Sequence, residues 1–414
     1  MTSATPDRGV EAWLGEHLDG LVAFRRNMHA HPELSGEEHA TTELVRERLA
    51  VAGLDSRTLS SGTGLVCDLD PDDAERSGGE RLALRADLDA LAMDDETTTP
   101  YRSQQPGVAH ACGHDVHTTI ALGTALYYAA HRDELPGRLR FIFQPAEERV
   151  PGGALDVITD GGLDDVGTII GLHCDPKLDV GSIGLKSGAI SSAADMATIT
   201  LTGPGGHTAR PEQTVDLVTV MGRIVAELPI RVAESLDDPD QVKLVFGAIH
   251  AGGAANVIPS HGTLSASVRT PSLEVWETLP DLVDALLRDL LRDTGAEYDL
   301  DYVHGVPPVV NHPSPVDVID RAARRELGDE AITPAVQSWG GDDFAWYTRE
   351  RAGAYVRLGV HDPSSNGLRL DLHAGHFDVD ERSIPVGVRL LAAAIREHFA
   401  ASTATADASA AGIT

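Results

Sequence analysis

The side chains best suited to metal binding gather in one short segment, residues 110–117. The segment contains His110, Cys112, His114, Asp115 and His117. Gly113 permits an irregular backbone in which Cys112 and His114 turn toward one cation, and a thiolate next to an imidazole favours a zinc-like metal. A turn with incidental histidines is the alternative, but this density of ligand-type residues favours a metal site.

Two adjacent carboxylates, Glu147 and Glu148, follow an apolar segment, 139–143, that is expected to form a strand. Ligands bind at the carboxyl edge of open α/β sheets, and adjacent residues at a strand end point in different directions. One carboxylate can therefore hold a metal while its neighbour serves as a general base. A solvated acidic turn is commoner where such a doublet stands alone, but here it accompanies other ligand-type residues.

Further ligand-type residues lie at other predicted strand ends. A strand expected over 168–172 ends at His173, and His373 and His376 lie near the C-terminus. A lone histidine in such a place is usually structural. These histidines are therefore candidate metal ligands only because other ligand-type residues accompany them in the sequence. The strand expected over 81–86 leads to two carboxylates, Asp87 and Asp89. Carboxylates in that place are suited to orienting metal-bound histidines.

The elements that must position these residues alternate between helix and strand. The apolar periodicity predicts helices over 11–30, 37–52 and 118–130 and strands over 64–69, 81–86, 139–143 and 168–172. Such alternation is typical of a parallel or mixed sheet covered on both faces, the α/β class.

From about residue 191 the pattern changes to a compact β-α-β-β-α-β unit. The predicted elements are a strand over 196–201, a helix over 214–227, strands over 242–249 and 262–268, a helix over 273–291 and a strand over 298–303. This order is ferredoxin-like. Helices expected over 316–326 and 385–399 return the chain to the first pattern. We therefore expect a catalytic domain from 1–188 and 305–400, an inserted α+β domain over 189–304 and a disordered tail over 401–414.

The composition narrows the function class. The formal net charge is −31, which repels nucleic acid and anionic membrane surfaces. We find neither a basic segment followed by an apolar run near the N-terminus nor an apolar stretch long enough to span a bilayer. The three cysteines, Cys67, Cys112 and Cys174, are too widely spaced for a disulfide framework and fit a reducing compartment. These features predict a cytoplasmic enzyme that acts on a small molecule.

Several motifs along nearly the whole chain, in a fixed order, resemble those of one family. They are His31-Pro-Glu-Leu-Ser35, Arg85-Ala-Asp-Leu-Asp-Ala-Leu91, His110-Ala-Cys-Gly-His-Asp115, Phe143-Gln-Pro-Ala-Glu-Glu148, Gly171-Leu-His173, Gly205-Gly-His-Thr-Ala-Arg-Pro211, Asn256-Val-Ile-Pro259, Gly341-Asp-Asp-Phe-Ala345 and Leu372-His373. The chain resembles the M20 metallopeptidases, in particular the aminoacylase-like amidohydrolases that include hippurate hydrolases and indoleacetyl-amino acid hydrolases. This resemblance implies a mixed-sheet, zinc-peptidase-like catalytic domain with an inserted ferredoxin-like lid and dimerisation domain.

The resemblance also implies roles for individual residues. Five residues would ligate two divalent cations, namely Cys112, His114, Glu148, His173 and His373. Family members work with zinc, manganese, cobalt or nickel, and the thiolate of Cys112 favours zinc. Glu147 would be the catalytic base, and Asp89 joins the candidate catalytic residues as a group that orients a bound histidine.

Three residues of the inserted domain would complete the site. His207 would stabilise the tetrahedral oxyanion, in its own or a partner subunit, which implies a homodimer through the inserted domain. Asn256 and Arg269 would hold the α-carboxylate of the substrate, since arginine suits bidentate carboxylate recognition. A structural salt bridge is an equal alternative for Arg269. A role for His376 stays open, because the segment around it departs from the family pattern.

The favoured function is a metal-dependent amidohydrolase that cleaves N-acyl amino acids or similar small amides. A dipeptidase or carboxypeptidase of the same family is the nearest alternative. An amidase with Cys112 as nucleophile and His114 or His117 as base is a second. A binding protein that only retains the fold is disfavoured, because the candidate base Glu147 is present.

Overall fold

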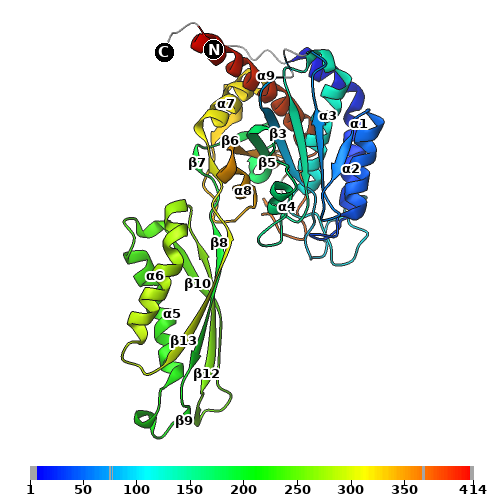
Figure 1. Cartoon of the computed structure of the whole chain (residues 1–414). Coiled ribbons are helices and arrows are strands. Elements are labelled where there is room, and N and C mark those ends of the chain that lie inside the picture. The colour runs from blue at the N-terminus through cyan, green and yellow to red at the C-terminus, as the bar shows by residue number, and fades with distance from the viewer. Residues whose placement is uncertain (1–6, 74–75, 77, 366–368, 411–414) are drawn as a thin grey trace. The chain divides into compact units, whose positions relative to one another are not determined.

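The computed structural model describes residues 7–73, 76, 78–365 and 369–410 (Figure 1). The chain forms two compact units. Unit 1 comprises Met1–Gly188, Val310–Val336 and Asp343–Thr414, and unit 2 comprises Ala189–Val309 and Gln337–Asp342. The chain therefore passes from unit 1 to unit 2 and back twice.

Unit 1 is built on an eight-stranded mixed sheet with the strand order β1-β2-β4-β3-β5-β16-β6-β15. These strands are β1 (Ser56–Thr58), β2 (Leu65–Leu69), β3 (Arg81–Asp87), β4 (Leu139–Gln144), β5 (Val166–Asp179), β6 (Ile183–Leu185), β15 (Ile332–Pro334) and β16 (Ala352–His361). The central strands β4, β3, β5 and β16 are parallel to one another. Short strands β7 (Gly188–Ala189) and β14 (Val310–Asn311) form a separate two-stranded sheet.

Helices cover the sheet of unit 1. They are α1 (Arg8–Ala30), α2 (His39–Val51), α3 (His114–Ala130), α4 (Ala154–Thr159), α7 (Pro313–Leu327), α8 (Phe344–Glu350) and α9 (Ser383–Ala410), with 3-10 turns η1 (Arg132–Glu134) and η4 (Asp329–Ala331). All seven residues of β3 are buried, which requires cover on both faces. The expected α/β class with a mixed sheet is confirmed.

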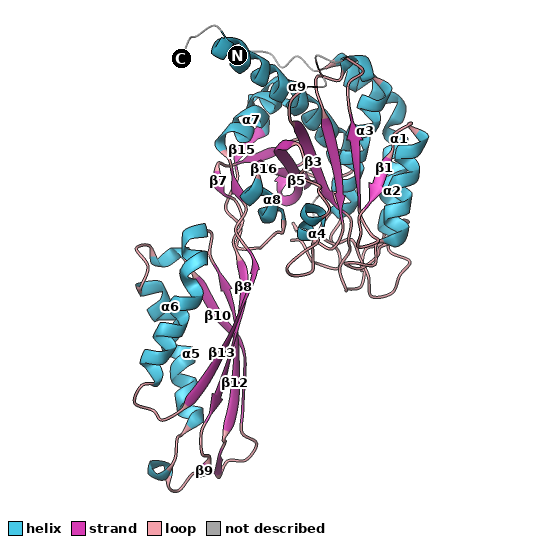
Figure 2. Cartoon of the chain, viewed as in Figure 1, coloured by secondary structure: helices cyan, strands magenta, loops and turns pink. Residues whose placement is uncertain are grey.

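Unit 2 is an antiparallel four-stranded sheet with two helices on one face (Figure 2). Its elements are β8 (Ala194–Thr202), β9 (Gly206–His207), η2 (Pro211–Gln213), α5 (Leu217–Glu234), η3 (Pro239–Gln241), β10 (Lys243–Ala251), β11 (Val257–Ile258), β12 (His261–Arg269), α6 (Leu273–Leu291) and β13 (Glu297–Val306). The strand order β10-β12-β8-β13 is the ferredoxin-like order that the sequence predicts. Burial alternates along β8 and β12, so the described part of unit 2 covers only one face of its sheet.

Two elements near the candidate ligands differ from the prediction. Helix α3 begins at His114, whereas the sequence predicts a helix only from residue 118, because Gly113 takes a left-handed conformation that starts the helix earlier. Strand β5 continues to Asp179, so His173 lies inside the strand and not at its end. The prediction that His173 terminates a strand is therefore wrong, although the residue stays at the same sheet edge.

Two further differences lie toward the C-terminus. The central strand β16 is absent from the prediction. Helix α9 runs to Ala410, into the segment predicted as a disordered tail, where alanine, the best helix former, occupies five of residues 401–410. Residues 411–414 lie outside the described residues. Within the described chain, no helix is both long and apolar enough to cross a membrane.

Candidate metal centre

The sheet of unit 1 brings three chain segments to one edge. β3 is hydrogen-bonded to β4 on one side and to β5 on the other, all in parallel, with Asp87 opposite Gln144. The carboxyl ends of parallel strands share one edge of a sheet, which is where α/β proteins bind ligands. Glu147 and Glu148 follow β4, Asp89 follows β3, and His173 lies in the carboxyl half of β5.

The backbone at Gly113 directs the other ligand-type residues toward this edge. Gly113 has φ of +93° at the N-cap of α3. A Cβ atom there would lie 2.7 Å from the Sγ atom of Cys174, so only glycine fits. Cys112 therefore lies just before the helix and His114 forms its first residue, close enough to face the same point.

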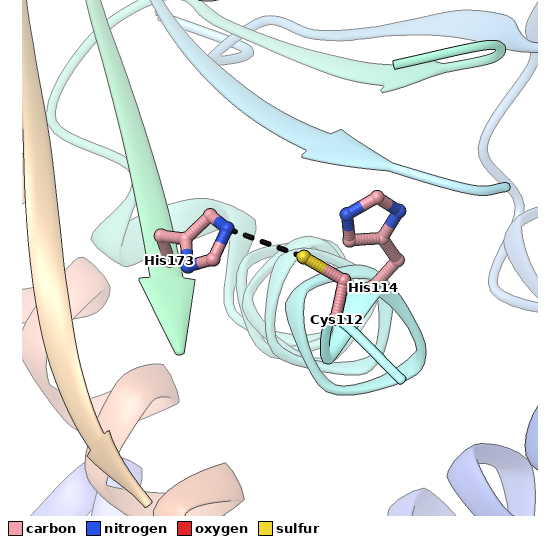
Figure 3. Close-up of side chains that lie close together, drawn as sticks. All are labelled: Cys112, His114 and His173. Atoms are coloured by element: carbon pink, nitrogen blue, oxygen red, sulfur yellow. Dashed lines mark hydrogen bonds between the residues drawn. The ribbon is translucent and has the colours of Figure 1, made fainter. Parts of the chain in front are cut away.

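The first cluster joins Cys112, His114 and His173, all buried (Figure 3). One ligand atom from each residue lies within 4.8 Å of the other two, and Cys112 Sγ is 3.5 Å from His173 Nε2. His173 Nδ1 lies 2.7 Å from the carbonyl oxygen of Cys174 and donates to it. The proton is thereby held on Nδ1, which leaves the Nε2 lone pair directed toward Cys112.

His114 presents a nitrogen without a hydrogen-bond partner to three carboxylates. Its Nδ1 lies 2.9 Å from the carbonyl oxygen of Asp89 and donates to it, while its buried Nε2 has no hydrogen-bond partner. That Nε2 lies 3.8 Å from carboxylate oxygens of Asp87, Glu147 and Glu148. Burial lowers the pKa of His114, but Asp87 and Asp89 outweigh burial and raise the pKa to about 10. The site therefore carries an excess of negative charge that favours a cation.

A second cluster joins Cys112, Glu148 and His373, again with ligand atoms within 4.8 Å of one another. His373 Nε2 lies 3.3 Å from Glu148 Oε1. The backbone N–H of His373 donates to the carbonyl oxygen of Ala111, which fixes the C-terminal loop beside Cys112. The two clusters share Cys112, so the five residues proposed as ligands lie together at one place.

The donor set fits divalent metal ions. Two clusters with a shared cysteine sulfur, imidazole nitrogens and carboxylate oxygens offer the mixed ligands of zinc-like sites. The telling observation is His114 Nε2, which is buried without a hydrogen-bond partner among three carboxylates. A cation at that point would satisfy a group that is otherwise costly to bury.

Around the clusters, two buried residues beyond the five candidate ligands hold those ligands in place. His117 Nδ1 lies 2.7 Å from Asp87 Oδ1, and the N–H of Cys174 donates to His117 Nε2 at 2.8 Å. Because Nε2 accepts a hydrogen bond, Nδ1 carries the proton and donates a hydrogen bond to Asp87. His117 is one of the ligand-type residues of segment 110–117, and it follows His114 by about one helical turn, which places it beside the site.

Asp343 is the second such residue. Its carboxylate accepts hydrogen bonds from Arg85 at 2.9 Å, from Gln144 at 2.9 and 2.7 Å, and from the N–H of Ala154 at 2.9 Å. Arg85 in turn pairs with Asp87. Burial raises the pKa of Asp87, but Arg85, His114 and His117 outweigh it and hold that pKa well below its usual range.

Asp89 joins two of the proposed ligands. Its Oδ1 lies 3.3 Å from His114 Nδ1, and its Oδ2 accepts from the N–H of Glu148 at 2.9 Å and from the hydroxyl of Ser35 at 2.7 Å. Asp89 therefore contacts both His114 and the backbone of Glu148. The orienting role expected from its place after β3 stays a prediction.

Two of the sequence's candidate histidines stay outside both clusters. His376 Nδ1 lies 2.8 Å from a carboxylate oxygen of Glu96, and its side chain is exposed. His110 is buried, neither ring nitrogen has a hydrogen-bond partner, and burial lowers its pKa to about 4. Among the described residues, neither belongs to a group with metal-ligand spacing.

The remaining candidates lie in unit 2, at different ends of its sheet. His207 in β9 pairs with Val257 in β11, next to Asn256, and both side chains are exposed. The N–H of Ala209 donates to His207 Nδ1 at 3.0 Å, so the proton of a neutral His207 ring is on Nε2. His207 can therefore donate a hydrogen bond from Nε2.

Arg269 lies at the opposite end of β12 from this pair. β12 runs from His261, beside the β9–β11 pair, to Arg269, and at roughly 3.3 Å per residue its ends are about 26 Å apart. The structure of one chain therefore does not bring Arg269 together with Asn256. The guanidinium of Arg269 donates to the carbonyl oxygen of Trp339 at 2.9 Å and contacts no carboxylate of the described residues, which gives the salt-bridge alternative no support.

Known proteins share this architecture and these motifs. An N-acyl-L-amino acid amidohydrolase of Geobacillus stearothermophilus is 36% identical over 70% of this chain and 78% of its own length. A protein of Rhodococcus jostii named as a putative glutamate–cysteine ligase is 44% identical over 91% of this chain, but the chain spans only 46% of that protein. Among solved structures, a dinuclear metal-binding M20 peptidase of Bacillus subtilis has a TM-score of 0.82 at 30% identity and covers 93% of this chain and 99% of its own.

The model of peptidase family M20/M25/M40 matches residues 83–397, which include all five residues of the two clusters as well as Glu147. The chain therefore belongs to peptidase family M20/M25/M40 and is an amide-bond hydrolase.

Proposed function

We propose that the protein cleaves N-acyl amino acids, with Cys112, His114, Glu148, His173 and His373 as ligands of two divalent metal ions. The observation that carries the proposal is the position of Glu147, whose Oε2 lies 3.8 Å from Nε2 of the candidate ligand His114. A carboxylate that borders the ligand set is placed to act on a water molecule there. When bound, divalent cations polarise a carbonyl group and lower the pKa of water toward ~7.

Glu147 is the proposed general base. Its side chain is only 10% exposed, so the carboxylate reaches the cluster from a largely buried position. It takes a proton from the attacking water and passes that proton to the leaving nitrogen, which completes the hydrolysis of the amide. Asp89 and Asp87 keep His114 in the orientation that this reaction needs.

His207 is the proposed donor to the tetrahedral oxyanion. Its Nδ1 accepts from the N–H of Ala209, so a neutral ring offers an N–H at Nε2. A preorganised donor aimed at the developing negative charge lowers the barrier of acyl transfer.

Asn256 and Arg269 are proposed to bind the substrate carboxylate. Asn256 lies next to the β9–β11 pair, whereas Arg269 lies at the far end of β12. This separation supports the idea that one chain supplies Arg269 while His207 and Asn256 come from a second copy. Unit 2 offers a surface for that copy, because β10 is an edge strand with Val245 and Ile249 exposed by 61% and 52%. Such an edge can pair with another chain. A homodimer through unit 2 is therefore part of the proposal.

Zinc or manganese is the proposed metal, and cobalt or nickel would also suit the ligands. The shared thiolate favours zinc. Cys67, Cys112 and Cys174 are buried and form no disulfide among the described residues, which supports a reducing, cytoplasmic location.

A substrate panel tests the proposal. N-acetyl, N-benzoyl and indoleacetyl amino acids, together with dipeptides, are assayed with zinc, manganese and cobalt. We expect turnover of the acylated amino acids above that of the dipeptides. Preferential cleavage of dipeptides would instead establish the dipeptidase alternative.

A thiol mechanism is the second candidate, because Cys112 Sγ lies 3.5 Å from a histidine nitrogen that can accept its proton. Chelation separates the two. The metal mechanism predicts that a chelator abolishes activity and that added metal restores it. Activity that survives complete metal removal, with covalent labelling of Cys112 by a substrate analogue, would establish the thiol mechanism.

A further inference from the structure

Two cations lie side by side in the sheet of unit 2. Lys243 in β10 and Arg269 in β12 are direct cross-strand partners in an antiparallel pair. Side chains directly opposite each other in such a pair point to the same face, and like charges in that arrangement destabilise a sheet. The pairing of Lys243 with Arg269 therefore lowers the stability of the sheet of unit 2.

Both side chains project from the face of the sheet that the helices leave uncovered. The alternate residues, Leu244 and Val268, are buried in the core with α5 and α6. Lys243 is exposed and Arg269 is half-buried. The next row on the same face includes Met196, with an exposed fraction of 58%. The cationic pair thus borders an open, partly apolar surface.

Neither cation has a carboxylate partner among the described residues. Arg269 donates to the carbonyl oxygen of Trp339 at 2.9 Å and to the hydroxyl of Ser267 at 3.3 Å. The Lys243 ammonium lies 3.9 Å from the centroid of the Trp339 ring, a cation–π contact. All three residues belong to unit 2, so Trp339 ties the two cations into one cluster.

The nearest carboxylate along the strands does not compensate this charge. Asp195 pairs with Val268 and so points to the helix-covered face. There it already accepts hydrogen bonds from Trp276, Tyr302 and the N–H of Gly305. The chain has 64 acidic and 33 basic residues. Two neighbouring cations without a carboxylate partner among the described residues are therefore a candidate binding site for an external anion.

We propose that Lys243, Arg269 and Trp339 form a dicarboxylate-binding site, which makes N-acyl derivatives of acidic amino acids the preferred substrates. This inference rests on the proposed function and narrows its substrate class. The planar guanidinium of Arg269 binds one carboxylate through its fork of N–H donors, and the ammonium of Lys243 binds the second. The ring of Trp339 keeps the ammonium in place. A dianion is otherwise repelled by the field of this acidic protein, so the two local cations are what makes its binding favourable.

Kinetics with a matched substrate pair test the site. N-acetyl-L-glutamate and N-acetyl-L-glutamine differ in the charge of the side chain, and both are assayed with the metal-loaded wild type and with Lys243→Gln. We expect Lys243→Gln to raise KM for the glutamate derivative roughly three- to tenfold, with kcat unchanged and no effect on the glutamine derivative. Lys186→Gln, which removes a lysine of unit 1, is the control and should leave both substrates unaffected.

A direct binding measurement separates this inference from the proposed function. Calorimetry records the affinity of metal-loaded Glu147→Gln for N-acetyl-L-glutamate, with and without Lys243→Gln. A Lys243-dependent affinity in Glu147→Gln, together with no hydrolysis of any acyl amino acid by the metal-loaded wild type, would sustain the site and overturn the proposed function. Hydrolysis of both substrates with equal efficiency, or an equal effect of Lys243→Gln on both, would overturn the site and leave the proposed function standing.

Discussion

The Nε2 atom of His114 lies 3.8 Å from the Oε2 atom of Glu147, and no hydrogen bond satisfies that nitrogen. The residue that begins α3 thus faces the carboxylate that follows β4, although the two are far apart in the sequence. One is a proposed metal ligand and the other the proposed base, so the fold brings the two proposed roles to the same place. Changes to the residues that support either group should therefore alter metal binding, turnover or both.

His117 is expected to set metal affinity through Asp87. Replacing His117 with Asn removes the ring that donates to Asp87 Oδ1 at 2.7 Å and accepts from the N–H of Cys174. Outer contacts of this kind change metal affinity by about 10- to 100-fold, and we expect a weakening in that range. Competition with a chromogenic chelator measures it. His131→Asn, at the other end of α3, is the control, and an equal loss there would show that helix stability and not Asp87 is responsible.

Gly113 is expected to tolerate no side chain. In Gly113→Ala the new Cβ would meet Cys174 Sγ at 2.7 Å in addition to the strain of φ +93°. Strain of this kind costs about 1–3 kcal/mol, and the displacement of Cys112 or Cys174 should also lower the metal content.

Gly181→Ala is the matched control for this change. Gly181 has the same φ of +93°, but a Cβ atom there would have no heavy atom within 4 Å outside its immediate chain neighbours. Thermal unfolding and metal analysis should show a modest loss of stability and full metal content for Gly181→Ala. Equal metal loss in both variants would mean that backbone strain alone, and not the clash with Cys174, disturbs the ligands.

Cys67 is expected to make the stability of the fold fall at alkaline pH. Burial raises the pKa of this thiol in β2 to about 12, above its ordinary value of 9.0. A raised pKa in the folded state means that the unfolded chain loses the proton first, so the contribution is complete below pH 9 and is lost as pH rises toward 12. Urea unfolding at about pH 8 and about pH 10.5 measures the difference. Cys67→Ala should lose less stability over this interval than the wild type, and an identical loss would refute the assignment.

The sequence predicted the elements with strong periodicity and the identity of the candidate ligands. Helix α6 has the predicted bounds, Leu273–Leu291, because its apolar positions recur at helical spacing and Ser272 caps its first turn. The family, the mixed α/β fold and the ferredoxin-like order of unit 2 are confirmed. The motifs also named all five residues that the structure brings together in two clusters.

Long-range packing explains what the sequence did not reveal. Strand β16 contains Gly353 and Gly359, which are typical of loops, yet a Cβ at Gly359 would meet the carbonyl oxygen of Asp179 at 2.1 Å. The glycine is needed for close approach to β5, which only the folded sheet reveals. The supporting role of Asp343 depends in the same way on contacts with Arg85 and Gln144, which are distant in the sequence.

Metal analysis and turnover of Glu147→Gln test the central claim most directly. Zinc-loaded wild type and variant are compared for metal ions per chain and for hydrolysis of an N-acyl amino acid. The account predicts two metal ions per chain in both proteins and a loss of turnover of roughly 100- to 10,000-fold in the variant. Near-normal turnover in Glu147→Gln, or full activity in wild-type protein that holds no metal, would contradict it.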